Sequence, residues 1–435
     1  MLCPLRQASL RAAFARQSYQ QQHHHHHHHQ ARLVLTLAAD RLAAATAPLP
    51  SAHHHHLANA PAPLRPTSAP GSPLRAMASA SSGGGAAAAA PKPPRALVHD
   101  KPGEPLDALE LRNLPLLREC GPGEIQLRFL QSPINPSDVN TVQGKYPIQP
   151  QLPGAVPGHE GVAEVVAVGS EVSRLSPGDW VVPLAPAQGT WRSAGTFAAA
   201  DWHRVPRDIG LEAAATLVIN PPTALAMLEN FVELQPGDTV AQNGATSAVG
   251  EAVIQIARAK GLRTVNLVRN RPDLAATVSR LKALGADLVT TEERLKDDLK
   301  ASGLPAPLLG LNCVGGSAAQ AVTRILQDGG TLVTYGGMSM QPVTASTAAM
   351  IFKDISFRGF WLTGRWSKAQ GPAGRAAAMD RIVDMYRAGA LQPPAVRTFA
   401  LGRWREAFAA LAAPHRGHKV ALAPSAEEEE DEGRG

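Results

Sequence analysis

From Ala96 onward, short segments of the chain alternate apolar and polar side chains with a period of two residues. This is the pattern of half-buried antiparallel strands, because successive side chains of a strand point to opposite faces of its sheet. Gly and Pro residues stand between the segments, where turns are expected. The segments are ALVHD (96–100), LELRNLPL (109–116), EIQLRFLQ (124–131), GVAEVVAVG (161–169) and GDWVVPL (178–184). The pattern predicts a β-rich domain over residues 96–218.

Beyond residue 218, short apolar strands are separated by helices. The expected strands are DTVAQ (238–242), TVNLV (264–268), DLVTT (287–291), LGLNCVG (309–315) and TLVTYGG (331–337). The first helix carries Val249, Val253, Ile256 and Ala257 at helical spacing, the second begins after Pro272-Asp273 and ends at Gly285, and the third is AAQAVTRILQ (318–327). This alternation predicts an α/β fold with a parallel, doubly wound sheet over residues 219–364.

A further helix, with Met379, Ile382, Val383 and Tyr386 on one face, follows this region. It leads into a short closing segment. We expect residues 365–424 to return to the β-rich domain, so that the dinucleotide fold is inserted within it.

The first 95 residues differ in composition from the rest of the chain. They hold nine basic side chains against one acidic residue, Asp40, and begin with MLCPLRQASLRAAFARQSYQ, which is compatible with an amphipathic helix. This is the composition of an organelle transit peptide, and the Ala-, Pro- and His-rich residues behind it predict a disordered leader. The formal charge of +6 therefore comes from the leader and does not indicate nucleic-acid binding.

The remaining composition excludes several other classes of protein. No run of 18 apolar residues occurs, so no membrane span is expected. Cys3, Cys120 and Cys313 have no paired spacing, which excludes a disulfide framework and fits a reducing compartment. Residues 425–435 are predicted to be a solvated acidic tail.

The turn after the first strand of the parallel sheet reads QNGATSAVGEA (242–252). Gly244 and Gly250 stand where the outer glycines of a GxGxxG dinucleotide fingerprint belong, and Ser247 and Ala248 fill the place of the middle glycine. Small residues let backbone N–H groups at a helix N-terminus approach a pyrophosphate. A tight structural turn is the alternative interpretation.

The end of the second parallel strand indicates which dinucleotide is bound. An NAD enzyme would place an acidic residue there to accept a hydrogen bond from the ribose 2′-OH. This chain instead has LVRNRPD (267–273), in which Arg269 and Arg271 flank Asn270. Two guanidinium groups suit a 2′-phosphate, so we predict NADPH, with ordinary surface arginines as the alternative.

His159-Glu160, in the segment PGHEG (157–161), is typical of one ligand position of zinc-dependent dehydrogenases. A catalytic zinc needs three protein ligands, and the two cysteine positions of such enzymes fall here on Asn135 and Asn220. An amide oxygen is a poor zinc ligand. We therefore predict that no metal is bound and that His159 is structural.

Tyr146 is the candidate for acid–base chemistry. It is one of four tyrosines and lies in a Gly- and Pro-rich loop, the kind of segment that often lines a site. A phenol has an ordinary pKa of about 10 and can donate a proton at neutral pH without a metal. The residues alone leave catalysis and plain packing equally open for Tyr146. They leave the same choice, pocket or core, for Trp191 and Trp361.

Several of these segments closely resemble those of mitochondrial trans-2-enoyl-CoA/ACP reductases, which are zinc-independent members of the medium-chain dehydrogenase/reductase superfamily. The resemblance covers about residues 96–421. The segments are INPSDVNTVQGKY (134–146), GDWVVPLAPAQGTWR (178–192), ATLVINPPTA (215–224), NLVRNRPD (266–273), LNCVGG (311–316), VTYGGM (333–338) and FKDISFRGFWL (352–362).

The resemblance implies a GroES-like catalytic domain and a Rossmann NADPH-binding domain. It also implies reduction of trans-2-enoyl-CoA or enoyl-acyl-carrier-protein in mitochondrial type II fatty acid synthesis, by a homodimer. The matrix is the expected location, with the plastid as the alternative. The family's catalytic tyrosine falls on Tyr146. Its cofactor contacts fall on Asn220, Thr246, Ser247, Ala248, Val249, Arg269, Asn270, Arg271, Tyr335, Gly336, Gly337, Met338, Phe360, Trp361, Leu362, Thr363 and Lys419.

The chain departs from the family at three positions. Thr246 and Ala248 replace the Asn and Gly usual in the glycine loop, and the family commonly lacks a His before Glu160. Two competing functions share the expected fold: a zinc-independent NADPH quinone oxidoreductase and a non-catalytic NADPH-binding protein. Turnover of an enoyl thioester would separate the proposed enzyme from both.

Overall fold

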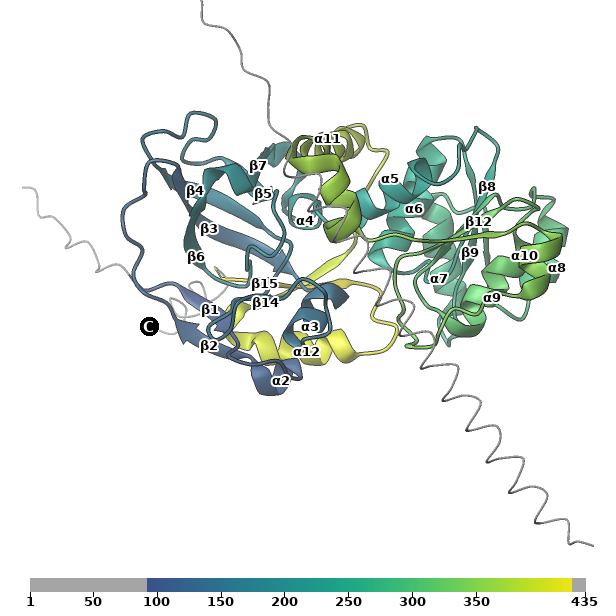
Figure 1. Cartoon of the computed structure of the whole chain (residues 1–435), viewed down its shortest axis with the longest axis horizontal. Coiled ribbons are helices and arrows are strands. Elements are labelled where there is room, and N and C mark those ends of the chain that lie inside the picture. Colours follow the sequence, from purple (N-terminus) through teal and green to yellow (C-terminus); the bar gives the residue numbers. More distant parts are fainter. Residues whose placement is uncertain (1–91, 425–435) are drawn as a thin grey trace, which may run out of the picture. The chain divides into compact units, whose positions relative to one another are not determined.

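The computed structural model describes residues 92–424. The predicted transit peptide, nearly all of the predicted leader, Cys3 and the acidic tail lie outside the described residues. The described residues belong to one compact unit, drawn in colour in Figure 1. Within residues 92–424, no helix is both long and apolar enough to cross a bilayer.

Residues 239–359 contain a six-stranded sheet in which neighbouring strands are parallel. The strand order is β10-β9-β8-β11-β12-β13, so the order reverses between β8 and β11. This is the order of a doubly wound dinucleotide-binding fold, and it confirms the predicted sheet. The strands are β8 (Thr239–Gln242), β9 (Arg263–Leu267), β10 (Leu288–Thr290), β11 (Leu309–Asn312), β12 (Thr331–Thr334) and β13 (Ser356–Gly359).

Helices connect these strands. α7 begins two residues after Pro272 and is closed by Gly285, whose φ of 110° lies in the left-handed region that favours glycine. α8 was not predicted, because its one buried residue, Leu295, leaves it without an apolar stripe. The helices are α6 (Ala248–Ala259), α7 (Leu274–Leu284), α8 (Leu295–Ser302), α9 (Gly316–Ile325) and α10 (Thr347–Phe352).

The β-rich part contains a seven-stranded sheet and a two-stranded sheet. In β3, the alternating residues Ile125, Leu127 and Phe129 are fully buried, as the period of two predicts. β2 is shorter than predicted and ends two residues before Pro115, which has no N–H to donate to a strand partner. The strands are β1 (Arg95–Val98), β2 (Glu110–Asn113), β3 (Glu124–Pro133), β4 (Val162–Val168), β5 (Trp180–Pro183), β6 (Ala194–Ala198), β7 (Trp202–Val205), β14 (Val396–Ala400) and β15 (Lys419–Ala423).

The end of the described chain joins the same sheet as β3. β15 pairs antiparallel with β3, so that Leu422 lies opposite Ser132, and β14 pairs with the other edge of β15. Residues almost 300 positions apart in the sequence are therefore direct neighbours. The remaining helices are α2 (Pro105–Ala108), α3 (Pro136–Val142), α4 (Leu211–Ala215), α5 (Asn220–Glu229), α11 (Ser367–Arg387) and α12 (Trp404–Ala412).

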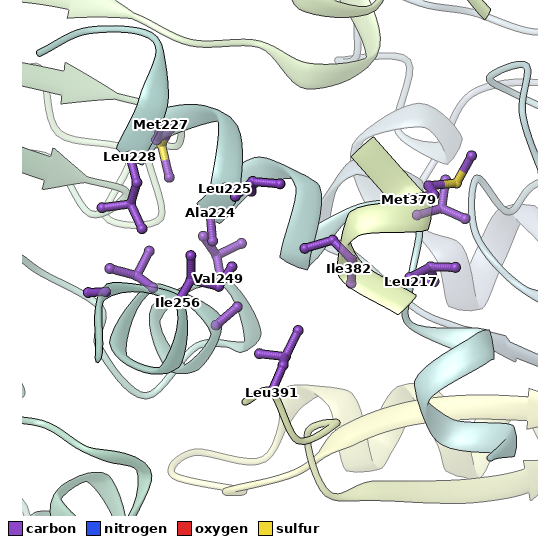
Figure 2. Packing of buried hydrophobic residues seen from close by; sticks show 14 of the residues in the cluster. Leu217, Ala224, Leu225, Met227, Leu228, Val249, Ile256, Met379, Ile382 and Leu391 are labelled. Atoms are coloured by element: carbon purple, nitrogen blue, oxygen red, sulfur yellow. The ribbon is translucent and has the colours of Figure 1, made fainter. Parts of the chain in front are cut away.

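One buried apolar cluster contains residues from both sheets, including Val162 of β4 and Leu311 of β11. Figure 2 shows the part formed by α5, α6 and α11, where Met379 and Ile382 of α11 lie beside Leu217. Met379 and Ile382 belong to the predicted apolar face of that helix. Because apolar burial is the main favourable term in folding, this shared core holds α5 and α11 in fixed positions beside the parallel sheet.

Candidate active site

The carboxyl ends of parallel strands meet at one edge of a sheet, and ligands of doubly wound folds bind where the strand order reverses. Here that point lies between β8 and β11. The predicted cofactor residues follow the carboxyl ends of β8, β9, β12 and β13. Two more come from outside the sheet: Asn220 is the first residue of α5, and Lys419 is the first residue of β15.

The turn between β8 and α6 has the close approaches that its glycines suggest. A Cβ on Gly244 would lie 2.4 Å from the Cys313 sulfur, and a Cβ on Gly250 would lie 2.7 Å from the Ala245 Cα. Ser247 caps α6, and its hydroxyl accepts a hydrogen bond from the Gly250 N–H.

At the start of α6, the backbone N–H groups of Ala248 and Val249 have no acceptor within residues 92–424. Unpaired N–H groups at a helix N-terminus are ready donors for an anion. Thr246, Ser247 and Ala248 are only partly buried. The residues present therefore fit the pyrophosphate of a dinucleotide.

The arginines after β9 differ in how firmly they are held. Arg271 donates to both carboxylate oxygens of Asp273 and to the His415 carbonyl, 3.1 Å away, and only 7% of its side chain is exposed. Arg269 and Asn270 are exposed. At the end of β9, the Arg271 guanidinium is therefore held in place, and the Arg269 side chain is exposed.

The segment after β12 runs along the edge of the predicted site. Burial raises the pKa of the Tyr335 phenol well above its ordinary value, and the neighbouring Cys313 adds to this shift. The Met338 N–H donates to the Cys313 carbonyl at 2.9 Å, which fixes the backbone that contains Gly336 and Gly337. The side chain of Met338 itself is 65% exposed.

Tyr146 lies in the loop after α3 and meets the segment that follows β13. Its hydroxyl is 2.7 Å from the Thr363 hydroxyl, and the Trp361 indole N–H donates to it at 2.8 Å. The Tyr146 ring also packs edge-on against Trp361 and tilted against His159, with centroids 6.0 and 5.6 Å apart. The structure thus joins the predicted catalytic residue to two predicted cofactor residues from more than 200 positions away.

Local backbone geometry explains how Trp361 reaches Tyr146. After β13, Leu362–Trp366 forms a short π-helical turn, and Leu362 and Thr363 are buried. A Cβ on Gly364 would lie 2.0 Å from the Trp361 ring, so only glycine leaves room for the indole. Phe360 packs edge-on against Phe231 at 6.0 Å on the preceding side. The turn therefore holds the Trp361 ring against Tyr146.

A buried polar cluster lies at the other end of α3. The Asn135 amide oxygen accepts from the Lys419 ammonium at 2.6 Å and lies 3.4 Å from the Asn220 amide nitrogen. The Asn135 amide nitrogen donates to Glu160 Oε2 at 2.8 Å. Glu160 Oε1 accepts from the backbone N–H groups of Val218 and Ile219. We call Asn135, Glu160, Asn220 and Lys419 the Asn135 cluster.

Burial governs the electrostatics of this cluster. It raises the pKa of the Glu160 carboxyl, and the Lys419 ammonium opposes that shift. Burial also lowers the pKa of Lys419, against the attraction of Glu160 and Asp138. The ammonium lies 3.9 Å from Glu160 Oε2, and both side chains are at least nine-tenths buried. In the sequence, Asn135 stands out only as the counterpart of a zinc-ligand position, and no pattern marks it or Glu160 as a functional residue.

The residues at this place do not fit a zinc ion. His159 Nε2 lies 3.0 Å from the Thr141 hydroxyl and 3.8 Å from Asp138. Because that hydroxyl donates to the Ser137 carbonyl, Nε2 must donate to it and cannot also bind a metal. The Lys419 ammonium already occupies the Asn135 oxygen. No group of three His, Cys, Asp or Glu residues in 92–424 is arranged to hold a metal.

Trp191 and Trp361, for which the sequence left both a core and a pocket position open, differ in burial. Trp191 is fully buried, donates to the Pro133 carbonyl and packs edge-on against Phe408 in the core. It is a core residue and not part of a pocket. Trp361 is 37% exposed and contacts Tyr146, so it remains a candidate for the substrate or nicotinamide site.

Family comparisons agree with this architecture. Residues 121–226 match the family described as Alcohol dehydrogenase GroES-like domain, and residues 248–375 match the family described as Zinc-binding dehydrogenase. The chain is 47% identical over 331 residues to the human protein named mitochondrial enoyl-acyl-carrier-protein reductase. That alignment covers 75% of this chain and 88% of the human protein.

Two solved structures are similar over nearly their whole length. A complex of Etr1p with NADP and crotonyl-CoA is 32% identical, with a TM-score of 0.70, and covers 76% of this chain and 99% of that chain. An Etr1p/Etr2p heterodimer of mitochondrial 2-enoyl thioester reductase from Candida tropicalis is 33% identical, with the same TM-score and coverage.

Proposed function

Because this chain belongs to the mitochondrial enoyl-acyl-carrier-protein reductases of the medium-chain dehydrogenase/reductase superfamily, we propose that it uses NADPH to reduce trans-2-enoyl thioesters to saturated acyl thioesters. The observation that carries the proposal is the contact of Tyr146 with Thr363 and Trp361, two residues that we propose as cofactor contacts. The substrates would be thioesters of CoA or of acyl-carrier protein, as the names of the relatives suggest.

NADPH, when bound, supplies a hydride to the β-carbon of the enoyl thioester. The N–H groups of Ala248 and Val249 would hold its pyrophosphate, and Arg269 and Arg271 would hold its 2′-phosphate. Asn220, at the start of α5, and Lys419, at the start of β15, would also contact the cofactor. The residues after β12 and β13 would line the rest of the site: Tyr335, Gly336, Gly337, Met338, Phe360, Trp361, Leu362 and Thr363.

Tyr146 would supply the proton that the α-carbon needs after hydride addition. Its O–H bond breaks as the new C–H bond forms, so the phenol becomes a phenolate. The Trp361 N–H already donates to this oxygen, and the Thr363 hydroxyl is 2.7 Å away and can also donate. Two donors aimed at the developing negative charge lower the barrier to proton transfer, and a solvent proton then restores the phenol.

The test is NADPH oxidation by the purified full chain, followed with crotonyl-CoA, with 2-decenoyl-CoA and with a benzoquinone. We expect oxidation with both enoyl thioesters and formation of the saturated acyl-CoA by mass spectrometry. Oxidation with the quinone alone would replace this proposal with quinone reduction. NADPH binding without turnover of any acceptor would replace it with a non-catalytic role.

The same proposal includes assembly as a homodimer. α10 and the loop before it carry large exposed apolar side chains, among them Met340 at 85% and Phe352 at 78% exposure, and contiguous apolar surface is typical of subunit contacts. β13, the edge strand beside them, pairs only with β12 within residues 92–424. Light scattering should give a dimer mass for the wild-type chain and a monomer mass for Phe352→Glu. The same mass for the wild-type chain and for Phe352→Glu would contradict this interface.

We also place the enzyme in the mitochondrial matrix, because its relatives are named as mitochondrial proteins and its first residues have the composition of a transit peptide. A fluorescent protein fused behind residues 1–95 should enter mitochondria. Entry into plastids would support the alternative location.

A further inference from the structure

The Asn135 cluster joins two proposed cofactor contacts that come from distant parts of the chain. Asn220 begins α5, and Lys419 begins β15. Their side-chain nitrogens lie 3.4 and 2.6 Å from the same acceptor, the Asn135 amide oxygen. No direct hydrogen bond joins Asn220 to Lys419 in the described residues. The relative placement of these two contacts therefore depends on the Asn135 side chain.

Hydrogen-bond polarity fixes the orientation of that side chain. A lysine ammonium has donors only, so the atom of Asn135 that faces Lys419 must be the amide oxygen. The amide nitrogen then faces Glu160 Oε2, 2.8 Å away, which accepts a hydrogen bond from it. If Asn135 turned over, its nitrogen would face the ammonium and its oxygen would face the carboxylate. Both contacts would then be repulsive.

Glu160 is fixed in turn by the backbone that leads into α5. Its second oxygen accepts from the N–H groups of Val218 and Ile219, at 3.1 and 2.9 Å. Ile219 directly precedes Asn220, so the same carboxylate positions the backbone of one cofactor contact. The Asn135 backbone is also held, because its N–H donates to the buried Asp138 carboxylate at 2.7 Å. Each buried partner in this chain of contacts has a defined role as donor or acceptor.

We propose that Asn135 and Glu160 are positioning residues for the nicotinamide cofactor. Together they hold the Asn220 amide and the Lys419 ammonium in place. This inference rests on the proposed binding of NADPH by Asn220 and Lys419. Neither Asn135 nor Glu160 needs to touch the cofactor, because each acts through the groups it orients.

The test exchanges the amide of Asn135 and the carboxylate of Glu160 while keeping the shape of each side chain. Asn135→Asp retains the oxygen for Lys419 but sets two carboxylates face to face. Glu160→Gln sets two amide nitrogens face to face. The double variant restores the pairing: the aspartate accepts from Lys419 and from the new glutamine nitrogen, and the glutamine oxygen still accepts from Val218 and Ile219. The readout is the Kd of NADPH, measured by calorimetry on the full chain without substrate.

We expect each single variant to raise the Kd about tenfold or more, the effect of one mispaired buried polar contact. The double variant should return to within about threefold of the wild type, as a coupled pair does in a mutant cycle. Gln131→Leu is the matched control: it removes a buried amide in β3 whose nitrogen donates to Thr398, and it should leave the Kd unchanged.

Single variants that lose thermal stability but keep the wild-type Kd would overturn the inference, because the pair would then be merely structural. A folded double variant that binds NADPH tenfold more weakly than the wild type would also overturn it, even if a single variant could not be purified. Because Kd is measured without substrate, these outcomes are distinct from failure of the proposed reaction. That failure would appear as wild-type binding without enoyl turnover.

Discussion

Tyr146 and Asn135 lie on either side of α3, and their surroundings differ in exposure and in charge. The Tyr146 hydroxyl meets two neutral groups, and its neighbour Trp361 is more than one-third exposed. Asn135, by contrast, is 2% exposed and lies between a buried carboxylate and a buried ammonium. A reacting group such as Tyr146 must be accessible to the substrate. A positioning group such as Asn135 holds its partners best when it is buried and all its hydrogen bonds are made.

The largest effect should come from Tyr146→Phe, which removes the proton and leaves the ring. We expect kcat to fall by about 10²–10⁴, the usual span for one acid–base group. Because the Asn135 cluster is untouched, the Kd of NADPH and the melting temperature should stay near their wild-type values. Turnover assays with crotonyl-CoA and calorimetry measure the three quantities. Near-normal turnover would remove Tyr146 from the chemistry.

Next comes Lys419→Met, which leaves Glu160 buried without its nearby ammonium. We expect the free energy of unfolding to fall by about 3–5 kcal/mol, as when one partner of a buried ion pair is deleted, and urea titration measures it. Lys419→Arg should lose much less, because it keeps the charge.

Lys260→Met is the less buried counterpart, since Lys260 pairs at 2.9 Å with the partly exposed side chain of Glu229, which also keeps Arg381 as a partner. Its expected loss is about 1 kcal/mol or less. Equal losses for the Lys419 and Lys260 variants would mean that burial does not distinguish the two pairs.

A smaller effect is expected for Thr363→Val, which keeps the side-chain shape and removes one hydroxyl facing Tyr146. Loss of one hydrogen bond to a developing phenolate should lower kcat about tenfold. Stability should change little. Thr323→Val, which removes a buried hydroxyl that donates to the Ala319 carbonyl in α9, is the matched control and should turn over normally. If both variants behave alike, the Thr363 contact does not assist the reaction.

The smallest effect is expected from metal removal. Because the Lys419 ammonium occupies the Asn135 oxygen, dialysis against a chelator should leave kcat unchanged, whereas a zinc-dependent alcohol dehydrogenase in the same dialysis should lose activity. Metal analysis of the dialysed and untreated protein accompanies the assay. Lost activity that returns with added zinc would contradict the assignment of this cluster.

Local rules explain why much of the parallel sheet could be predicted. Gly250 meets a steric limit set by Ala245, five residues before it, and Gly285 ends α7 with a left-handed backbone. Each of these backbone constraints depends on a few residues that are close together in the sequence, so it can be recognised from the sequence. The apolar face of α11 is also a local pattern, and its members lie in the core.

The contacts that make the site are not local. Tyr146 and Thr363 are 217 positions apart, and Asn135 and Lys419 are 284 apart, so their meeting depends on the complete topology. Pattern could not separate Trp191 from Trp361, because an indole suits a core and a pocket equally well. The sequence shows that His159 stands where the family commonly lacks a histidine. The hydrogen bond that His159 donates to the Thr141 hydroxyl depends on the fold.

The pairing of β15 with β3 also determines when, during synthesis of the chain, the Asn135 cluster can be completed. Ribosomes make chains from the N-terminus, and early regions can begin to fold before later ones appear. Glu160 and Asp138 are synthesised long before Lys419, the first residue of the last described strand. Until that strand pairs with β3, the Asn135 cluster lacks its ammonium, so the cluster can be completed only after the last described strand has been made.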